Sequence, residues 1–339
     1  MFKLIEVTDQ KSLDTFVIAS GGDFLQSWAW GDFQATQGSA LLRLAVVDAS
    51  DKYLAVVTLI KKSLPYGRYY WFAPRGPVIA NLSDQEFQAV WSFLIKSLAT
   101  RARADKIAFL RFEPSANSAQ ATYQVWPLVL GAANIYKTLD LEPSKTAILD
   151  LSQDLPTLLA SMHHKTRYNI NLAGKKNLSI KLATSSDFEA WWQLLSTTAE
   201  RDEFRLHSRD YYQVMLSLPI MKLYLAYHGE DLLAGILVAQ FGYTATYVHG
   251  ASANQGRELM APHLLQWRAI TDAKASSALH YDFYGIDAHK WPGVTRFKAG
   301  FAGQNLAYLG TFDLVWCLGY YKFYTLGRQL FRFFSKLVR

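Results

Sequence analysis

Cysteine is almost absent from this 339-residue sequence, in which Cys317 is the only one. One cysteine cannot form an intrachain disulfide or a thiolate zinc cluster, and its apolar, aromatic surroundings favour packing over a nucleophilic role. A chain without disulfides suits a reducing compartment. His163, His164 and His289 have no cysteine or spaced carboxylate on the same predicted element, so no metal site is expected.

Long apolar runs are also missing. No uninterrupted stretch approaches the roughly 20 residues that a helix needs to span a bilayer. Residues 1–7 are typical of a first strand and lack the basic start and apolar core of a signal peptide. We therefore expect a cytoplasmic protein, either soluble or bound peripherally at the inner face of the plasma membrane.

Three familiar site motifs are absent as well. The sequence has no His-Glu-x-x-His metalloprotease motif and no Gly-x-Ser-x-Gly nucleophile elbow. Proteins that bind coenzyme A hold its pyrophosphate on a glycine-rich turn that opens a helix. Neither residues 74–77 nor residues 254–258 have that pattern, so no cofactor is expected.

What the chain does contain is apolar, aromatic and basic. Hydrophobic residues make up 50% and aromatic residues 14%, which suits packed layers of strands and helices. The net charge of +7 favours a polyanionic partner such as RNA, a nucleotide or anionic lipid, with an ordinary basic soluble protein as the alternative. The length predicts two domains of about 150 residues each.

One supersecondary pattern occurs twice along the chain. In the first half, strands at 42–47 and 53–60 flank a polar turn, and a strand at 69–73, a helix at 84–103 and a buried strand at 107–114 follow. The second half repeats this order with strands from 221, 232 and 244, a helix at 262–275 and a strand at 279–285. We expect an α/β fold of two tandem domains, at 1–150 and 151–318, and a basic, aromatic C-terminal helix at 319–339.

This order of elements resembles the core of the GNAT acyltransferase fold, here doubled. The elements are a hairpin, a strand, a loop, a helix and a further strand. The chain is similar to the FemABX family, the aminoacyl-tRNA-dependent peptidyltransferases of peptidoglycan bridge formation. The resemblance extends along nearly the whole chain and rests on LQSWAWGDFQ at 25–34, PRGP at 74–77, KTRYNI at 165–170, TAERDEF at 198–204, GAS at 250–252, MAP at 260–262 and RFKAGF at 296–301.

The resemblance implies an aminoacyltransferase that moves an amino acid from aminoacyl-tRNA onto the side-chain amine of a peptidoglycan stem peptide. The acceptor is lipid II or a UDP-MurNAc-pentapeptide, and we expect a monomer. Some relatives carry a long helical arm in the second domain. The segment 155–176 contains a predicted basic helix at 162–170. Only about forty residues separate this segment from residue 221, too few for such an arm at 1.5 Å per residue each way.

The segment that points most clearly to a site is YDFYGID at 281–287 followed by WPGVTRFKAGF at 291–301. Lys298 matches the family's catalytic lysine and is expected to stabilise the oxyanion or bind a phosphate, with Phe297 shaping the pocket. Arg296 offers a bidentate fork for phosphate. Asp282 and Asp287 are candidates for positioning the acceptor amine or taking its proton. The alternatives are a solvated basic turn and structurally paired carboxylates.

Other residues are expected to bind substrate. The charged connection around 201–212 supplies Arg201, Arg205, His207 and Tyr211 for the diphosphate and sugar of the precursor, with surface salt bridges as the alternative. Arg75 belongs to the PRGP segment, and Tyr247 is expected to face the acceptor peptide unless it packs in the core. The family's arginine four residues before the tyrosine is replaced by His207, and a lysine near residues 32–35 is missing, which puts a UDP-linked acceptor in doubt.

Two other functions compete with this prediction. One is an acyl-CoA-dependent N-acyltransferase of an envelope polysaccharide or peptide. The other is a non-catalytic module that binds RNA or a membrane, for which the basic, aromatic residues 320–339 offer an interfacial helix. A helix packed on the body with solvated lysines and arginines is the alternative for that segment.

Overall fold

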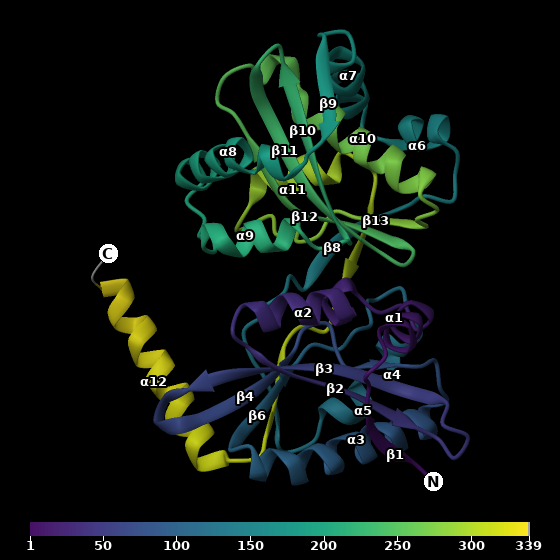
Figure 1. The fold of residues 1–339 in the computed structure, drawn as a ribbon, viewed down its shortest axis with the longest axis vertical. Coiled ribbons are helices and arrows are strands. Elements are labelled where there is room, and N and C mark those ends of the chain that lie inside the picture. The colour runs from purple at the N-terminus through teal and green to yellow at the C-terminus, as the bar shows by residue number, and fades with distance from the viewer. Residues whose placement is uncertain (338–339) are drawn as a thin grey trace. The chain divides into compact units, whose positions relative to one another are not determined.

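A computed structural model describes residues 1–337, with side chains through residue 330. The last two residues of the predicted C-terminal helix lie outside the described part. The chain forms two compact units, residues 1–142 with 308–339, and residues 143–307 (Figure 1). Each unit has one mixed sheet with helices packed on it, so the predicted α/β class is confirmed.

The first unit contains a sheet in the order β1-β2-β3-β4-β6-β15-β7, with β5 paired to β3. Helices α1 and α2 lie on one face of this sheet and α3 on the other (Figure 1). The bounds are β1 Lys3–Glu6, α1 Gln10–Ala19, α2 Trp28–Thr36, β2 Ala40–Val47, β3 Tyr53–Leu64, β4 Arg68–Ala73, β5 Val78–Ile79, α3 Asp84–Ala104, β6 Ile107–Phe112, α4 Thr122–Val125, α5 Pro127–Leu130, β7 Ile135–Lys137, β15 Phe312–Val315 and α12 Leu318–Leu337.

The second unit contains a sheet in the order β14-β8-β13-β12-β11-β10-β9. The bounds are β8 Lys145–Asp150, α6 Leu155–Ser161, α7 His164–Ala173, β9 Leu178–Leu182, α8 Phe188–Arg201, α9 Arg209–Leu216, β10 Met221–His228, β11 Asp231–Phe241, β12 Thr244–Ser252, α10 Ala261–Ala275, β13 His280–Asp282, α11 Pro292–Ala299 and β14 Gln304–Ala307. Among the described residues of this unit no helix is longer than the 15 residues of α10, as expected for a chain without a helical arm.

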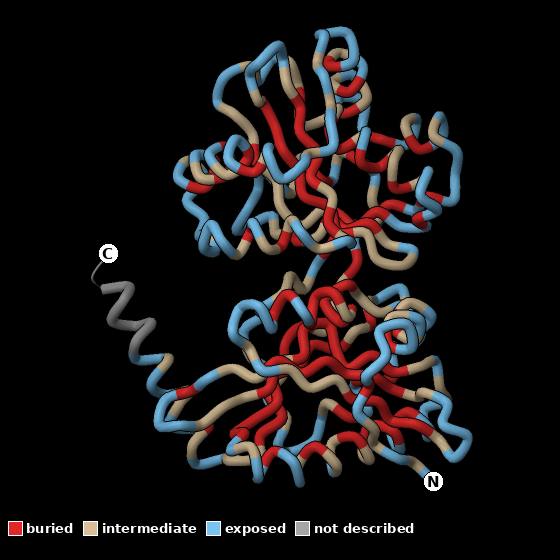
Figure 2. The backbone as a smooth tube through the Cα atoms, in the orientation of Figure 1, coloured by how far each residue is buried: buried red, intermediate tan, exposed pale blue. Residues whose placement is uncertain are grey.

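The two sheets repeat one arrangement. In each, an antiparallel hairpin leads to a third strand, a helix follows, and the next strand pairs in parallel with the third. These are β2, β3, β4, α3 and β6 in the first unit, and β10, β11, β12, α10 and β13 in the second. Buried residues run along the central strands of both sheets, because apolar side chains on them pack against the helices (Figure 2). The predicted duplication is therefore present.

The domain limits differ from the predicted ones. Strand β8, expected to close the first domain, pairs with β13 and β14 and belongs to the second unit. Strand β15, expected in the second domain, pairs with β6 and β7 and completes the first sheet. Each correction arises from strand pairing between segments far apart in sequence, which local patterns do not encode.

The basic helix predicted at residues 162–170 corresponds to α7, and a separate helix, α6, precedes it. Met162 has extended backbone between α6 and α7, and the backbone N–H of His163 donates to the carbonyl of Gly300 at 2.9 Å. The His163 side chain then accepts a hydrogen bond from the backbone N–H of Lys165 and caps α7. The tertiary contact with Gly300 replaces a helical hydrogen bond, which explains the break.

Candidate active site

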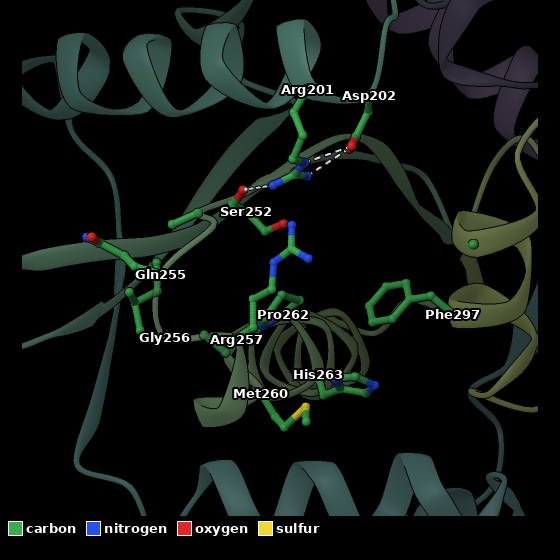
Figure 3. Close-up of a pocket in the computed structure, with 14 residues that line it drawn as sticks. Arg201, Asp202, Ser252, Gln255, Gly256, Arg257, Met260, Pro262, His263 and Phe297 are labelled. Carbon is green, nitrogen blue, oxygen red and sulfur yellow. Dashed lines mark hydrogen bonds and ion pairs between the residues drawn. The ribbon is translucent and has the colours of Figure 1, made fainter.

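A cavity of about 410 Å³ lies in the second unit, at the end of β12 and the start of α10. Its volume falls within the range of ordinary ligand sites. It is lined by residues of α8, β11, β12, the loop that follows β12, α10 and α11 (Figure 3), namely Arg201, Asp202, Leu233, Ser252, Ala253, Gln255, Gly256, Arg257, Met260, Ala261, Pro262, His263, Gly293 and Phe297.

The loop between β12 and α10 has a specific backbone course. Gly256 and Met260 both have left-handed backbone, with φ of 66° and 54°. A Cβ at Gly256 would also lie 3.1 Å from Leu233, so glycine is the residue that fits this position best. Pro262 then stands in the first turn of α10, where its missing N–H costs nothing. The loop thereby places Arg257 near the N-terminus of α10.

The cavity carries a net positive charge at this end. Arg201 forms a bidentate pair with Asp202, at 2.7 and 2.8 Å, and donates to the carbonyl of Ser252 at 2.8 Å. Arg257 donates to the side-chain oxygen of Asn254 at 2.7 Å and is in none of the ion pairs formed by the described residues. Arg201 is therefore neutralised by Asp202, whereas the charge of Arg257 is available to an anion.

Phe297 and His263 form the opposite wall. Figure 3 shows the Phe297 ring, which comes from α11, pointing toward the space occupied by the Arg257 side chain. The rings of His263 and Phe297 meet edge to face, with centroids 5.0 Å apart. Burial lowers the pKa of His263 to about 4, so this ring is neutral at physiological pH. Its Nδ1 is buried without a hydrogen-bond partner, while Nε2 lies 3.3 Å from the Asn169 side chain.

Lys298, adjacent to Phe297, points into the protein. Only 7% of the residue is exposed, and its Nζ donates to the carbonyl of Gly285 at 2.8 Å and to that of Tyr284. The ammonium also lies 5.2 Å from the centroid of the Tyr247 ring, within cation–π range. Burial lowers the pKa of Lys298 to about 8, and the nearby Asp282 carboxylate offsets part of that effect. The alternative of a solvated basic turn is wrong, because Arg296, Phe297 and Lys298 belong to helix α11, in whose first turn Pro292 stands.

The lowered pKa of Lys298 predicts a pH-dependent stability. Between about pH 8 and 10.5 the unfolded chain binds this proton and the folded chain does not, so the destabilisation is complete below pH 8 and is relieved as pH rises. Relative to Lys298→Met, the wild-type free energy of unfolding should rise by roughly 1.4 kcal/mol per pH unit in this window. Urea unfolding at pH 7.5, 8.5 and 9.5 measures it, with exposed Lys176→Met as control. Parallel curves for wild type and Lys298→Met would contradict the prediction.

Asp282 and Tyr247 surround the Lys298 amine. Asp282 is buried, and accepts hydrogen bonds from the Thr146 hydroxyl and from the backbone N–H of Tyr284, the latter at 2.7 Å. Burial raises the pKa of Tyr247 to about 12, so its hydroxyl stays protonated. A Cβ at Gly250 would lie 1.8 Å from that hydroxyl, so only glycine leaves room for this ring position. Asp282 therefore lies beside Lys298, where its charge favours the ammonium form.

A second aromatic group lies between α9 and β12. His207 stacks on Tyr211, with ring centroids 4.0 Å apart, and Tyr212 contacts His249 edge to face at 5.2 Å. Burial lowers the pKa of His249 to about 4, with a smaller contribution from His207 and Lys298. The two predicted residues His207 and Tyr211 are therefore in contact with each other. The neighbouring Tyr212 contacts His249 on β12, the strand that also carries Tyr247.

The remaining predicted residues lie elsewhere. Arg205 and Arg296 have exposed side chains. Asp287 structures its own loop, because its carboxylate accepts from the backbone N–H groups of His289 and Lys290, at 2.9 and 3.0 Å, and these bonds lower its pKa. Arg75 belongs to the first unit, where it is 1% exposed and stacks 3.5 Å above the Tyr308 ring.

Three residues of this region were not predicted from the sequence: Arg257, His263 and His249. Arg257 and His263 lie on either side of the MAP segment, whose proline signals the start of a helix. His249 lies one residue before the GAS segment. Its contact with Tyr212 depends on the packing of α9, which no local pattern reveals. Among the described residues, no group of three His, Cys, Asp or Glu side chains is placed to hold a metal ion.

Comparisons with known proteins agree with this architecture. The chain is 21% identical to the lipid II:glycine glycyltransferases of Staphylococcus saprophyticus and Staphylococcus aureus, over 92% of this chain and 92% of each relative. A crystal structure of FemX superposes with a TM-score of 0.84, at 18% identity, and covers 95% of this chain and 99% of FemX. A tandem GNAT protein from the clavulanic acid biosynthesis pathway gives a TM-score of 0.56 at 11% identity, over 92% of this chain and 98% of that protein.

These structures confirm the prediction of two tandem GNAT-like domains. The family model described as the FemAB family matches residues 8–128, 131–227 and 220–328, which together make up most of the sequence. The chain belongs to the FemAB family.

Proposed function

We propose that this protein is an aminoacyltransferase that moves an amino acid from aminoacyl-tRNA onto the side-chain amine of a peptidoglycan stem peptide. The observation that carries the proposal is the position of Lys298, buried with a lowered pKa directly beside Phe297 on the cavity wall. Membership of a family that includes lipid II:glycine glycyltransferases supports the reaction class. We expect the protein to act as a monomer, at the inner face of the plasma membrane.

The chemistry needs few protein groups. The acceptor amine attacks the carbonyl carbon of the aminoacyl ester, a C–N bond forms, and the C–O bond to the ribose 3′ oxygen breaks. The proton lost by the amine goes to the leaving 3′ oxygen, either directly or through substrate hydroxyls. The Lys298 ammonium stabilises the negative charge that develops on the carbonyl oxygen. Asp282, which accepts from Thr146 and Tyr284, helps to keep that lysine charged.

The cavity suits the 3′ end of an RNA. Arg257 offers a guanidinium to a phosphate, and the Phe297 ring offers a face for stacking a base. Coenzyme A is a poorer fit, because it needs several unoccupied backbone N–H groups at a helix start. Here the N–H groups of Met260 and His263 donate to the carbonyls of Arg257 and Met260, and Pro262 has none.

The acceptor is assigned to the neighbouring polar surface. The His207–Tyr211 stack offers a flat face for a sugar ring, and the Tyr247 ring lies 5.2 Å from the Lys298 amine. Arg205 and Arg296, both exposed, are proposed to contact phosphate groups, and Arg201 to hold the loop that carries Arg257. Arg75, buried against the Tyr308 ring, is proposed to hold its own loop in the first unit.

A reconstituted transfer assay tests the function. Purified protein is incubated with radiolabelled mixed aminoacyl-tRNAs and either lipid II or UDP-MurNAc-pentapeptide, and parallel reactions contain acetyl-CoA in place of the tRNAs. We expect label in one of the two precursors, abolished when the tRNA is first digested with ribonuclease. Transfer from acetyl-CoA alone would favour the N-acyltransferase alternative. No transfer from any donor, by folded protein with verified substrates, would overturn the proposal.

A further inference from the structure

Helix α12, the last element of the first unit, packs on the sheet through one face only. Tyr321 is buried against Phe109, with ring centroids 5.3 Å apart, and its hydroxyl donates to Asp313 at 2.9 Å. Tyr324 contacts the same Phe109 ring at 5.7 Å, and the Tyr320 hydroxyl donates to the carbonyl of Pro65 at 2.9 Å. These tyrosines fix the orientation of the first turns of the helix.

A different face of α12 is apolar and exposed. Phe323, Leu326 and Leu330 follow one another at spacings of three and four residues, which places them on one stripe of the helix. Their exposed fractions are 58%, 56% and 50%. Tyr66, 80% exposed at the turn before β4, extends the stripe, since its ring centroid lies 5.8 Å from that of Phe323. Large apolar side chains gathered in this way usually mark an interaction surface.

The charge of this segment indicates which partner it meets. Residues 318–339 contain no aspartate or glutamate, and their basic residues are Lys322, Arg328, Arg332, Lys336 and Arg339. An apolar stripe on a helix whose charged side chains are all basic is typical of a helix that lies in the interface of an anionic bilayer. A second copy of this chain would bring like charges together. Among the described residues, no helix is long and apolar enough to cross a membrane.

We propose that α12, together with Tyr66, docks the protein on anionic lipid. Phe323, Leu326 and Leu330 enter the boundary between headgroups and acyl chains, and Lys322, which is exposed next to Phe323, contacts the lipid phosphates. The proposal does not depend on the transfer reaction, because it concerns a surface formed by α12 and the turn at residues 65–67. Its test therefore requires no substrate.

Vesicle sedimentation tests the proposal with the full-length protein. Wild type should bind phosphatidylglycerol vesicles and bind phosphatidylcholine vesicles much more weakly. Leu326→Glu/Leu330→Glu should weaken binding to the anionic vesicles by about 100-fold, because apolar burial is lost and negative charge is added. Lys322→Gln should weaken it by roughly 5-fold, from about 1 kcal/mol per basic residue near the surface.

The matched control is Leu139→Glu/Leu141→Glu, which makes the same charge change at two exposed leucines of the same unit. It should bind as wild type does, and thermal unfolding should show that all variants are folded. Equal binding by the control and the α12 variants would overturn the proposal. The proposal would also be overturned if the wild type did not bind anionic vesicles and instead formed a dimer that the Leu326→Glu/Leu330→Glu change dissociates.

Discussion

Lys298→Met is expected to lower the rate of amino-acid transfer by about 10²–10³-fold, the usual effect of removing one donor to a developing oxyanion. Two of the three N–H groups of the ammonium donate to the carbonyls of Tyr284 and Gly285. We propose that the third donates to a substrate oxygen. Because that contact strengthens only in the transition state, kcat should fall while KM stays close to the wild-type value. Steady-state kinetics with saturating aminoacyl-tRNA would measure both constants.

The pH dependence separates chemistry from structure. With a pKa of about 8, the Lys298 ammonium is present at pH 7 and is lost as pH rises. Lys298→Arg keeps its charge throughout this range, so the ratio of the wild-type rate to the Lys298→Arg rate should fall above pH 8. The titration of the acceptor amine cancels in this ratio. Lys176→Met, at an exposed lysine, should leave transfer unchanged.

The opposite result has a clear meaning. If Lys298→Met transfers at the wild-type rate and only its stability changes, the lysine serves to hold the carbonyls of Tyr284 and Gly285. The proposal for its chemical role would then be wrong, although the tRNA-dependent reaction could still be observed. Retention of biological activity by the variant, together with no transfer by the wild type, would instead favour the non-catalytic RNA- or membrane-binding alternative.

The duplicated fold could be predicted from the sequence because its signals are local. The polar turns at residues 48–52 and 229–230 lie between strands with apolar alternation, and α3 begins at Ser83 with a capping box that includes Glu86. The domain limits could not be predicted, because β8 joins the sheet of the second unit and β15, much later in the chain, joins the sheet of the first unit. Their pairing is decided by partners that are distant in sequence.

The site was predictable to the extent that its residues are neighbours in sequence. Phe297 and Lys298 follow one another, yet one lines the cavity and the other is buried, as successive side chains of a helix point in different directions. The wall formed by His263 and Phe297 joins α10 to α11, and only the tertiary structure shows it. Arg75 has the charge expected for a substrate contact, but it stacks on the ring of Tyr308, which is more than 200 residues later in the sequence.

Asp313→Ala is expected to destabilise the protein by about 3–5 kcal/mol, the cost of leaving a buried charge without its partner. Arg111 on β6 and Asp313 on β15 form a bidentate pair with both bonds at 2.7 Å, and their side chains are 4% and 0% exposed. Burial alone would lower the pKa of Arg111, but its hydrogen bonds to Asp313 outweigh this and raise it. Because the ordinary pKa of a guanidinium is above about 12, the arginine stays charged even when the aspartate is removed.

Urea unfolding of the single variants and the double variant isolates this effect. Arg111→Met/Asp313→Leu removes both charges and should recover much of the stability that either single change loses. The exposed pair of Arg101 and Glu6, also at 2.7 Å, provides the control, and Glu6→Ala should cost less than about 1 kcal/mol. Asp313→Ala should also weaken vesicle binding, since Asp313 accepts from the Tyr321 hydroxyl that fixes α12. A loss no larger than that of Glu6→Ala would show that β15 is held by its backbone pairing alone.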